Sequence, residues 1–455
     1  MTINIIESLN AIKYFNEEAE NLLKLLVEMK EPELISKPLR SIQEEVIQEI
    51  NEREILYSFI TQVDKNGNET GRYFNISKDK WLGIDSDNYE KIEKMHKNLY
   101  KRQGINRHIG KKALLEILFE WMKVRVIGSQ KEQLPFTEYL NKSFSGMVKD
   151  QKISIPIINM AIDLEFSIGN VKFEYMNKQL FDEIEVKMKE NVNNIGNTER
   201  NISEEISSLR KKYQGKVVAT VNVFAETEKA IEIAEKEVDR AIAVLKFYSP
   251  SAFALRASAL FGRKGLIQLP IRELFIFSDS LPTIHQGFVG NQSYVFKIDR
   301  ALLGKLEAIG FTKLSGLISD RELSSFEELI LSALYMFTKA ISYIEYHEKI
   351  VFVLSALEIV LLKDSGEPIQ IHVGQRLGFL INKSPEERKR IVDMVGKAYS
   401  IRSNYIHHGR ENEDNDVLIK LQRGCWSMLN IMIQNHDKFK GKDEFVNFIE
   451  NLIYS

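Results

Sequence analysis

The sequence Ile350-Val-Phe-Val-Leu-Ser-Ala-Leu-Glu-Ile-Val-Leu-Leu362 decides how the last third of the chain folds. Its apolar residues would cover almost every face of a helix, and such helices lie at the centre of a bundle or in an interface. The run is too short to cross a bilayer, and it contains the charged residue Glu358. We therefore expect a buried central helix that carries one carboxylate.

Amphipathic helices are predicted on both sides of this run. Ser384-Pro385-Glu386-Glu387 has the composition of a helix start, with a serine cap, a proline at the first position and acids in the first turn. Five or six helices with short connections make a helical bundle. The apolar positions that define the helices are Phe326, Leu329, Ile330, Leu334, Phe337, Ile341 and Ile344, then Ile371, Leu377 and Leu380, then Ile391, Val395 and Ala398, and in a final long helix Leu418, Leu421, Cys425, Met428 and Ile431.

The segment Ala398-Tyr-Ser-Ile-Arg-Ser-Asn-Tyr-Ile-His-His-Gly409 concentrates reactive side chains in a chain with only eight histidines. Arg402 lies four residues after Ala398 and continues the apolar face of its helix, so it should point into the bundle or an interface. An inward guanidinium needs an acidic or phosphate partner, because an unpaired buried charge is costly. Glu358 and a bound phosphodiester are the two candidate partners.

His407 lies five residues after Arg402, which is a rotation of roughly 140° in a regular helix. One straight helix would therefore not direct both side chains to the same point. The helix could unwind at its end, since Gly409 suits a left-handed terminal residue. Alternatively, two copies of the helix could face each other across a dimer axis and share one cleft.

The side chains in this segment suit metal-independent RNA cleavage. Attack of a ribose 2′-hydroxyl on phosphorus needs a base, an acid and a cation for the developing charge. Histidine suits the proton transfers, and arginine suits the phosphate oxygens. No carboxylate cluster or His-x-x-x-His pair in the region indicates a metal. Spacing alone slightly favours another interpretation, in which His-His-Gly ends a helix and Arg402 makes a structural salt bridge.

The C-terminal 130 or so residues resemble the HEPN superfamily, and specifically its ApeA-like branch. The resemblance rests on Ala356-Leu-Glu-Ile-Val-Leu-Leu362, on Gln375-Arg-Leu-Gly-Phe-Leu380 and on Tyr399-Ser-Ile-Arg-Ser-Asn-Tyr-Ile-His-His-Gly409. HEPN ribonucleases carry an arginine, four to six residues and then a histidine. Arg402 and His407 match that pattern with four residues between them.

The resemblance implies a metal-independent endoribonuclease that acts as a dimer or a higher even oligomer and needs no cofactor. It also implies a role in bacterial anti-phage or toxin-type defence, with a phage-derived trigger and transfer RNA as one candidate substrate. Arg402 and His407 would be the catalytic pair. Many members carry Asn, Asp or His directly after the arginine, where this chain has Ser403. The supporting candidates are Ser403, Asn404, Tyr405, His408 and Glu358.

The rest of the chain predicts an α+β multidomain protein that is mostly α. We expect a mostly helical N-terminal region (1–150), with a turn at Asp64–Gly71 and a helix from Lys111. An α+β module with an antiparallel sheet should follow (151–320), with a sensor or regulatory role, and then the HEPN-like bundle (321–455). The α+β module would begin with a hairpin around Gly169-Asn170, with strands at 162–168 and 171–175. A mobile loop opening into a short helix would follow at 191–210. The later elements would be a strand at 217–223, a helix at 226–245 and strands at 274–277 and 294–298.

Composition restricts the function classes. The formal net charge is −2, so any RNA contact must come from a local patch such as the basic residues between Lys97 and Lys112, which otherwise form a solvated face. The single cysteine, Cys425, excludes a disulfide framework and a cysteine-based zinc site. No targeting segment or membrane span is evident, so we expect a soluble cytoplasmic protein.

Two further functions remain open from the sequence. A HEPN-like bundle could bind RNA or nucleotide, or assemble subunits, without cutting. The chain could also be a toxin that an antitoxin silences by nucleotide transfer to Tyr405.

Overall fold

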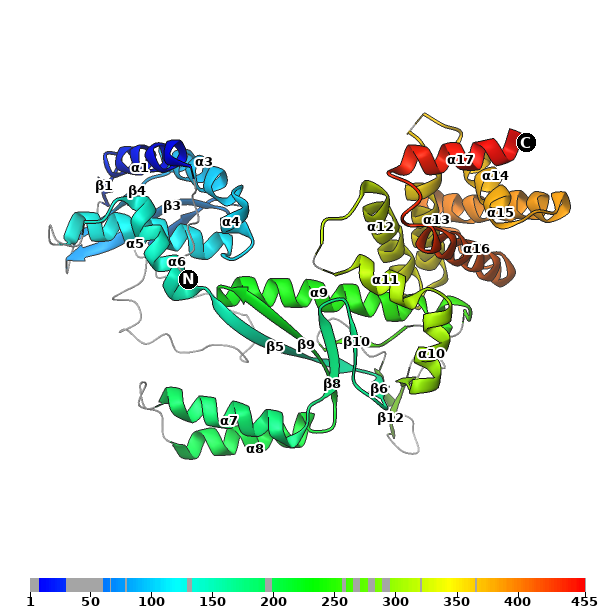
Figure 1. Cartoon of the computed structure of the whole chain (residues 1–455), viewed down its shortest axis with the longest axis horizontal. Coiled ribbons are helices and arrows are strands. Elements are labelled where there is room, and N and C mark those ends of the chain that lie inside the picture. The colour runs from blue at the N-terminus through cyan, green and yellow to red at the C-terminus, as the bar shows by residue number, and fades with distance from the viewer. Residues whose placement is uncertain are drawn as a thin grey trace. The chain divides into compact units, whose positions relative to one another are not determined.

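The computed structural model describes residues 8–29, 60–65, 67–77, 80–128, 133–192, 199–255, 259–264, 271–276, 283–288, 295–319, 321–364 and 366–454. The chain is mostly helical, with antiparallel sheets as expected (Figure 1). It forms two compact units. The first comprises residues 1–151 and 223–233, and the second comprises residues 152–222 and 234–455.

The first unit packs helices against a four-stranded antiparallel sheet in the order β1-β4-β3-β2. Its core is aromatic, with Phe15, Phe74, Trp121 and Phe136 almost fully buried. The predicted turn at 64–71 joins β2 to β3, and the helix predicted from Lys111 is α5. The apolar positions Ile42, Val46 and Ile50 lie outside the described residues. The elements are α1 (Leu9–Leu23), β1 (Val27–Glu28), β2 (Ile60–Val63), β3 (Glu69–Ser77), β4 (Lys80–Ile84), α3 (Tyr89–Tyr100), α4 (Gln103–Asn106), α5 (Lys111–Ile127) and α6 (Phe136–Met147).

The second unit contains a five-stranded sheet in the order β10-β5-β9-β8-β7. The hairpin predicted at Gly169-Asn170 is confirmed, because β7 pairs antiparallel with β8 and Gly169 has φ +56°. The upstream strand is interrupted after Ile162, and β6 pairs in parallel with β13 instead. The strands are β5 (Lys149–Ile158), β6 (Met160–Ile162), β7 (Phe166–Ile168), β8 (Val171–Tyr175), β9 (Val217–Ala225), β10 (Gly262–Arg263), β11 (Ile271–Ile276), β12 (Thr283–Phe288) and β13 (Phe296–Ile298), and helix α9 (Thr227–Phe247) follows β9 as predicted.

The short helix predicted within 191–210 is confirmed, because residues 199–210 are helical, whereas residues 191 and 192 belong to the preceding helix and not to a loop. Helices α7 (Lys178–Val192) and α8 (Glu199–Tyr213) pack against each other as a pair (Figure 1). Arg210 forms ion pairs with Asp182 and Glu185 across this pair. Phe181 and Ile206 are also buried. The two helices are thus joined by a small apolar contact together with ion pairs between them.

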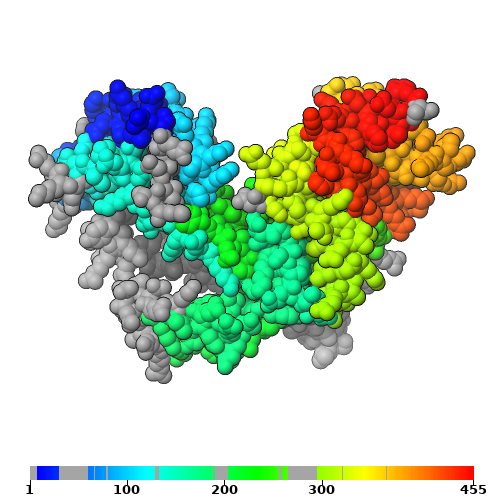
Figure 2. Space-filling model, viewed as in Figure 1, coloured from blue at the N-terminus to red at the C-terminus, as the bar shows by residue number. Residues whose placement is uncertain are grey.

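The C-terminal bundle surrounds the predicted central helix, α13 (Tyr346–Leu361), whose residues Ala356, Leu357, Val360 and Leu361 are fully buried. Ser384 caps α15 (Pro385–His408) as predicted. Cys425 is buried in α16 (Asn415–Gln434), but this helix is not the last one, because α17 (Lys442–Tyr454) follows and packs on α14 (Ile369–Ile381). Figure 2 shows the α17 segment in red beside the orange α14 and α15 segments. The remaining helices are α10 (Arg300–Ala308), α11 (Phe311–Leu317), α12 (Ser325–Ala340) and the 3-10 turn η2 (Pro250–Ala252).

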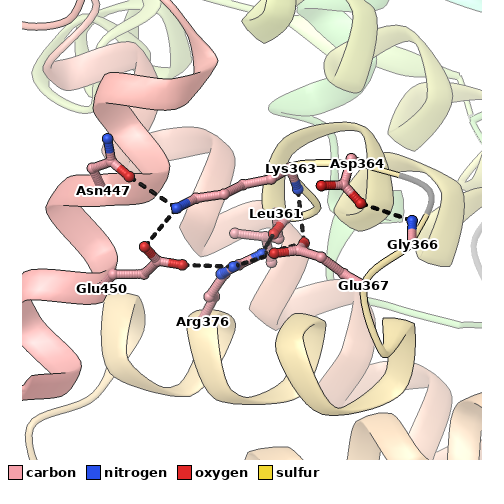
Figure 3. A network of polar contacts seen from close by, with 8 residues as sticks. All are labelled: Leu361, Lys363, Asp364, Gly366, Glu367, Arg376, Asn447 and Glu450. Carbon is pink, nitrogen blue, oxygen red and sulfur yellow. Dashed lines mark hydrogen bonds and ion pairs between the residues drawn. The ribbon is translucent and has the colours of Figure 1, made fainter.

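A buried arginine ties three of these helices together (Figure 3). Arg376 of α14 is 1% exposed and donates to the Leu361 carbonyl at the end of α13 at 2.6 Å. Its guanidinium also binds both carboxylate oxygens of Glu367, at 2.7 and 2.8 Å, and Glu450 of α17 at 2.7 Å. Lys363 completes the network by binding Glu450 at 2.6 Å. This network fixes α17 on the bundle, and the guanidinium offsets the partial negative charge of the helix dipole at the C-terminus of α13.

Candidate functional site

Helix α15 carries the Arg-His segment and stays regular to its end. It runs for 24 residues from Pro385 to His408. Gly409 follows with φ +59°, and its N–H donates to the Tyr405 carbonyl at 3.0 Å, while the Arg410 N–H donates to the Asn404 carbonyl at 3.2 Å. These bonds cap the helix after the histidines. Gly409 is left-handed as predicted, but the helix stays intact up to His408, so the first of the two alternatives, unwinding between Arg402 and His407, is excluded.

Gly409→Ala should lower the free energy of unfolding by about 1 kcal/mol, because a side chain disfavours the left-handed conformation. No atom lies within 4 Å of a Cβ added at Gly409, so the expected cost is conformational and not steric. Thermal unfolding of the full chain measures this cost. Gly304→Ala in α10, where a Cβ also meets open space, is the matched control and should stabilise the protein slightly. An unchanged melting temperature for Gly409→Ala would contradict the cap.

Arg402 pairs with Glu358 of the central helix, which is one of the two predicted partners. Its Nη1 donates to Glu358 Oε1 at 2.7 Å, and the Tyr399 hydroxyl donates to the same oxygen at 2.9 Å. Burial and the Glu358 charge raise the pKa of Tyr399 above its ordinary value, so Tyr399 remains a donor. The Arg402 side chain is 29% exposed. Its Nε and Nη2 form no hydrogen bond within the described residues and are not buried. Two donors of one guanidinium are therefore available to a ligand.

A second contact lies further along the same two helices. The His347 ring of α13 stacks on the Tyr405 ring of α15 at 4.3 Å and 8°. His347 is 7% exposed, and its buried Nε2 has no hydrogen-bond partner among the described residues. The neighbouring Tyr346 hydroxyl bonds to both backbone groups of Asp414, which caps α16 at the end of the segment that follows α15. Residues 346 and 347 thus hold the chain on both sides of His407 and His408.

The two histidines face solvent. His407 and His408 are both exposed, and neither forms a hydrogen bond or an ion pair with the described part of the chain. Their rings lie 6.5 Å apart. Ser403 and Ile406 are exposed as well. Since the helix is regular, His407 points roughly 140° away from Arg402 around its axis. One copy of the chain therefore does not bring Arg402 and His407 together.

Asn404 lies on a third side of α15. It lines a shallow groove of about 830 Å³, together with residues of α14, α15 and the segment before α16. The groove is lined mainly by amides, a hydroxyl and acids, among them Gln370, Ser400, Asn412 and Asp414. Neither Arg402 nor His407 lines this groove, and the predicted site residues separate into three groups.

The spacing of residues would have revealed three side chains that the sequence analysis gave no role. Tyr399 precedes Arg402 by three residues, so both lie on one face of α15. His347 precedes Glu358 by eleven residues, which is close to three full turns of α13. Antiparallel packing of the two helices then places Glu358 against Tyr399 and Arg402, and His347 against Tyr405. Arg376 has the same signal, because it lies between Val373 and Leu377 on the apolar face of α14.

No family model, curated protein or solved structure matches this chain. Among the residues that the structure describes, no group of three His, Cys, Asp or Glu side chains is placed to hold a metal ion. Within those same ranges, no helix has both the length and the apolar character needed to cross a membrane.

Proposed function

We propose that the protein is a metal-independent endoribonuclease of the HEPN type, whose site forms when two copies bring Arg402 and His407 together. The observation that carries the proposal is the state of Arg402. Glu358 holds its guanidinium through one nitrogen and leaves two donors open, on a helix that ends in two exposed, unpaired histidines. If two copies of α15 pack antiparallel across a two-fold axis, Arg402 of one copy can face His407 of the other, so the angle between them within one helix no longer keeps them apart.

The chemistry follows from these groups. The 2′-oxygen of a ribose attacks the adjacent phosphorus, the bond from phosphorus to the 5′-oxygen breaks, and the proton passes from the 2′-hydroxyl to the leaving 5′-oxygen. One His407 would take the first proton, and the His407 of the second copy would supply the other. Arg402 would bind the non-bridging oxygens through its open donors. The products are a 2′,3′-cyclic phosphate and a 5′-hydroxyl.

Arg402→Ala should abolish RNA cleavage, since the charge on phosphorus would lose its cation; a loss of about 10²–10³-fold is expected. The assay incubates the full chain with total RNA and with transfer RNA in EDTA and identifies the ends of the products. Arg402→Lys is the informative control. Lysine retains the charge beside Glu358 but lacks the planar pair of donors, so stability should persist while cleavage falls. Full activity in either variant, or activity that EDTA removes, would contradict the proposal.

A second function is a bundle that binds RNA or assembles subunits without cutting. The Arg402–Glu358 ion pair supports it, because this pair satisfies the arginine without any ligand. Product analysis separates the two functions. Binding of RNA with no new fragments, under conditions in which a related nuclease cuts, would favour the non-catalytic function.

The biological setting belongs to the same proposal. The activity would operate in the cytoplasm as an RNA-cleaving effector in anti-phage or toxin-type defence, and residues outside the bundle would sense a phage-derived trigger. Silencing by nucleotide transfer to Tyr405 is the less favoured mode of control. The Tyr405 ring is half-buried and stacked on His347, so its reaction would require that stack to open.

A further inference from the structure

A strongly basic surface lies where α8 ends and β9 begins. Residues 206–225 contain no Asp or Glu, although they include Arg210 and three lysines. A fourth lysine joins them from the end of β10. We call these four residues the lysine cluster, and all of them are exposed: Lys211, Lys212, Lys216 and Lys264.

The lysine cluster is arranged around one aromatic ring. Lys264 donates from Nζ to the Tyr213 hydroxyl at 3.0 Å, and its ammonium lies 4.8 Å from the centre of that ring. The ammonium of Lys212 lies 5.5 Å from the same ring. The Lys216 N–H donates to the Tyr213 carbonyl. This turn places Lys216 close to Tyr213 in the fold. The hydrogen bond from Lys264, and then the charge of Lys212, lower the pKa of Tyr213, as a positive local field would.

The charge of the lysine cluster is not balanced within the described residues. None of its four ammonium groups has an ion pair there, whereas lysines elsewhere do, such as Lys172 with Glu165. Asp182 and Glu185, the acids of α7 that face α8, are paired with Arg210. Cations at a helix C-terminus stabilise its dipole, which explains Lys211 and Lys212. Lys216 and Lys264 lie outside the helix, so the dipole does not account for them.

We propose that the lysine cluster is a docking surface for the phosphate backbone of RNA. The chain as a whole has a net charge of −2, so binding to a polyanion must come from a local excess of cations such as this one. Lysine ammonium groups bind phosphate as point charges, without reading a sequence. The choice of RNA rests on the proposed function. The cluster lies on α8 and beside β10, and not on α15, so it would hold the substrate at a second place and leave the cutting to Arg402 and His407.

The test compares two full-length variants that each lose four positive charges. The first replaces every lysine of the cluster with glutamine. The control replaces four exposed lysines of the same unit that also lack ion pairs within the described residues: Lys236, Lys305, Lys383 and Lys389. The affinity for an uncleavable single-stranded RNA is measured between low and moderate salt, with a polyglutamate peptide in parallel. Melting temperatures confirm that both variants fold.

The cluster variant should bind the RNA at least about tenfold more weakly. The slope of log affinity against log salt concentration should become shallower by about 3, because each of four lost phosphate contacts in a single strand contributes roughly 0.7 to that slope. The control should stay within about twofold of the natural protein. Equal losses in both variants, or unchanged RNA binding, would overturn the proposal. Unchanged RNA binding with lost polyglutamate binding would assign the surface to an acidic protein instead. Because this measurement needs no cleavage, it can fail while the nuclease proposal stands, and the reverse also holds.

Discussion

His407→Ala should reduce RNA cleavage by about 10²–10⁴-fold, because it removes the group that transfers the proton. The free energy of unfolding should change by less than about 0.5 kcal/mol, since His407 is exposed and forms no hydrogen bond within the described residues. The measurement is the initial rate of fragment formation from total RNA, combined with thermal unfolding and a measurement of oligomeric state. Loss of activity with an intact fold and oligomer would identify a chemical role.

His408→Ala is the matched control for this variant. The two histidines are adjacent, both are exposed, and both lie in the last turn of α15. They differ by about 100° in direction around the helix. Because only His407 matches the Arg-His pattern, His408→Ala should lower the rate less than about tenfold. Undiminished cleavage in His407→Ala would exclude the proposed mechanism.

The second large effect concerns stability. Arg376→Met should lower the free energy of unfolding by about 3 kcal/mol, because it leaves Glu367 and Glu450 without the cation between them. It also leaves the Leu361 carbonyl without its donor. Chemical denaturation of the full chain measures the change. Lys363→Met is the control, because Lys363 is a second cation that binds Glu450 but its side chain is 32% exposed. Its loss should lower the free energy of unfolding by less than about 1 kcal/mol.

Acid should remove the part of this difference that comes from the carboxylates and leave the part that comes from the Leu361 carbonyl. The Arg376 hydrogen bonds lower the pKa of Glu367 to about 2, below its ordinary value. A carboxyl whose pKa is lowered on folding stabilises the protein above its unfolded pKa, and that stabilisation is lost as the pH falls toward the folded value. The natural protein and Arg376→Met should therefore differ fully above about pH 5 and converge toward pH 2. A gap that stays constant over this range would show that the carboxylates are not responsible.

Periodicity identified the elements that depend on local pattern. The all-round apolar run at 350–362 predicted the central helix α13, and the spacing of Arg402 from Ala398 predicted its inward direction, with Glu358 as one of two candidate partners. Gly169 predicted the β7–β8 hairpin. In each of these cases, a physical requirement acts over a few residues or along one helix face.

Polar segments were harder to interpret. The packing of α8 on α7 was not predicted, because it depends on Arg210 meeting Asp182 and Glu185, which lie 28 and 25 residues away along the chain. Helix α17 was absent from the prediction, although Phe445, Val446 and Ile449 lie at helical spacing, and its position depends on Glu450 reaching Arg376. Such contacts join charges that are distant in sequence, so a local period can mark a helix but not its charged partners.

The sequence by itself determined that the last third of the chain is a helical bundle and that Arg402 lies on an inward helix face. It also determined that a histidine pair precedes the glycine that ends its helix. Only the tertiary structure decided which donors of Arg402 remain open and that His347 stacks on Tyr405. It also decided that α15 stays regular through His408, so that Arg402 and His407 diverge within one copy. The reason is that helical period depends on neighbours three and four residues apart, whereas the orientation of a guanidinium or a ring depends on the helix packed against it.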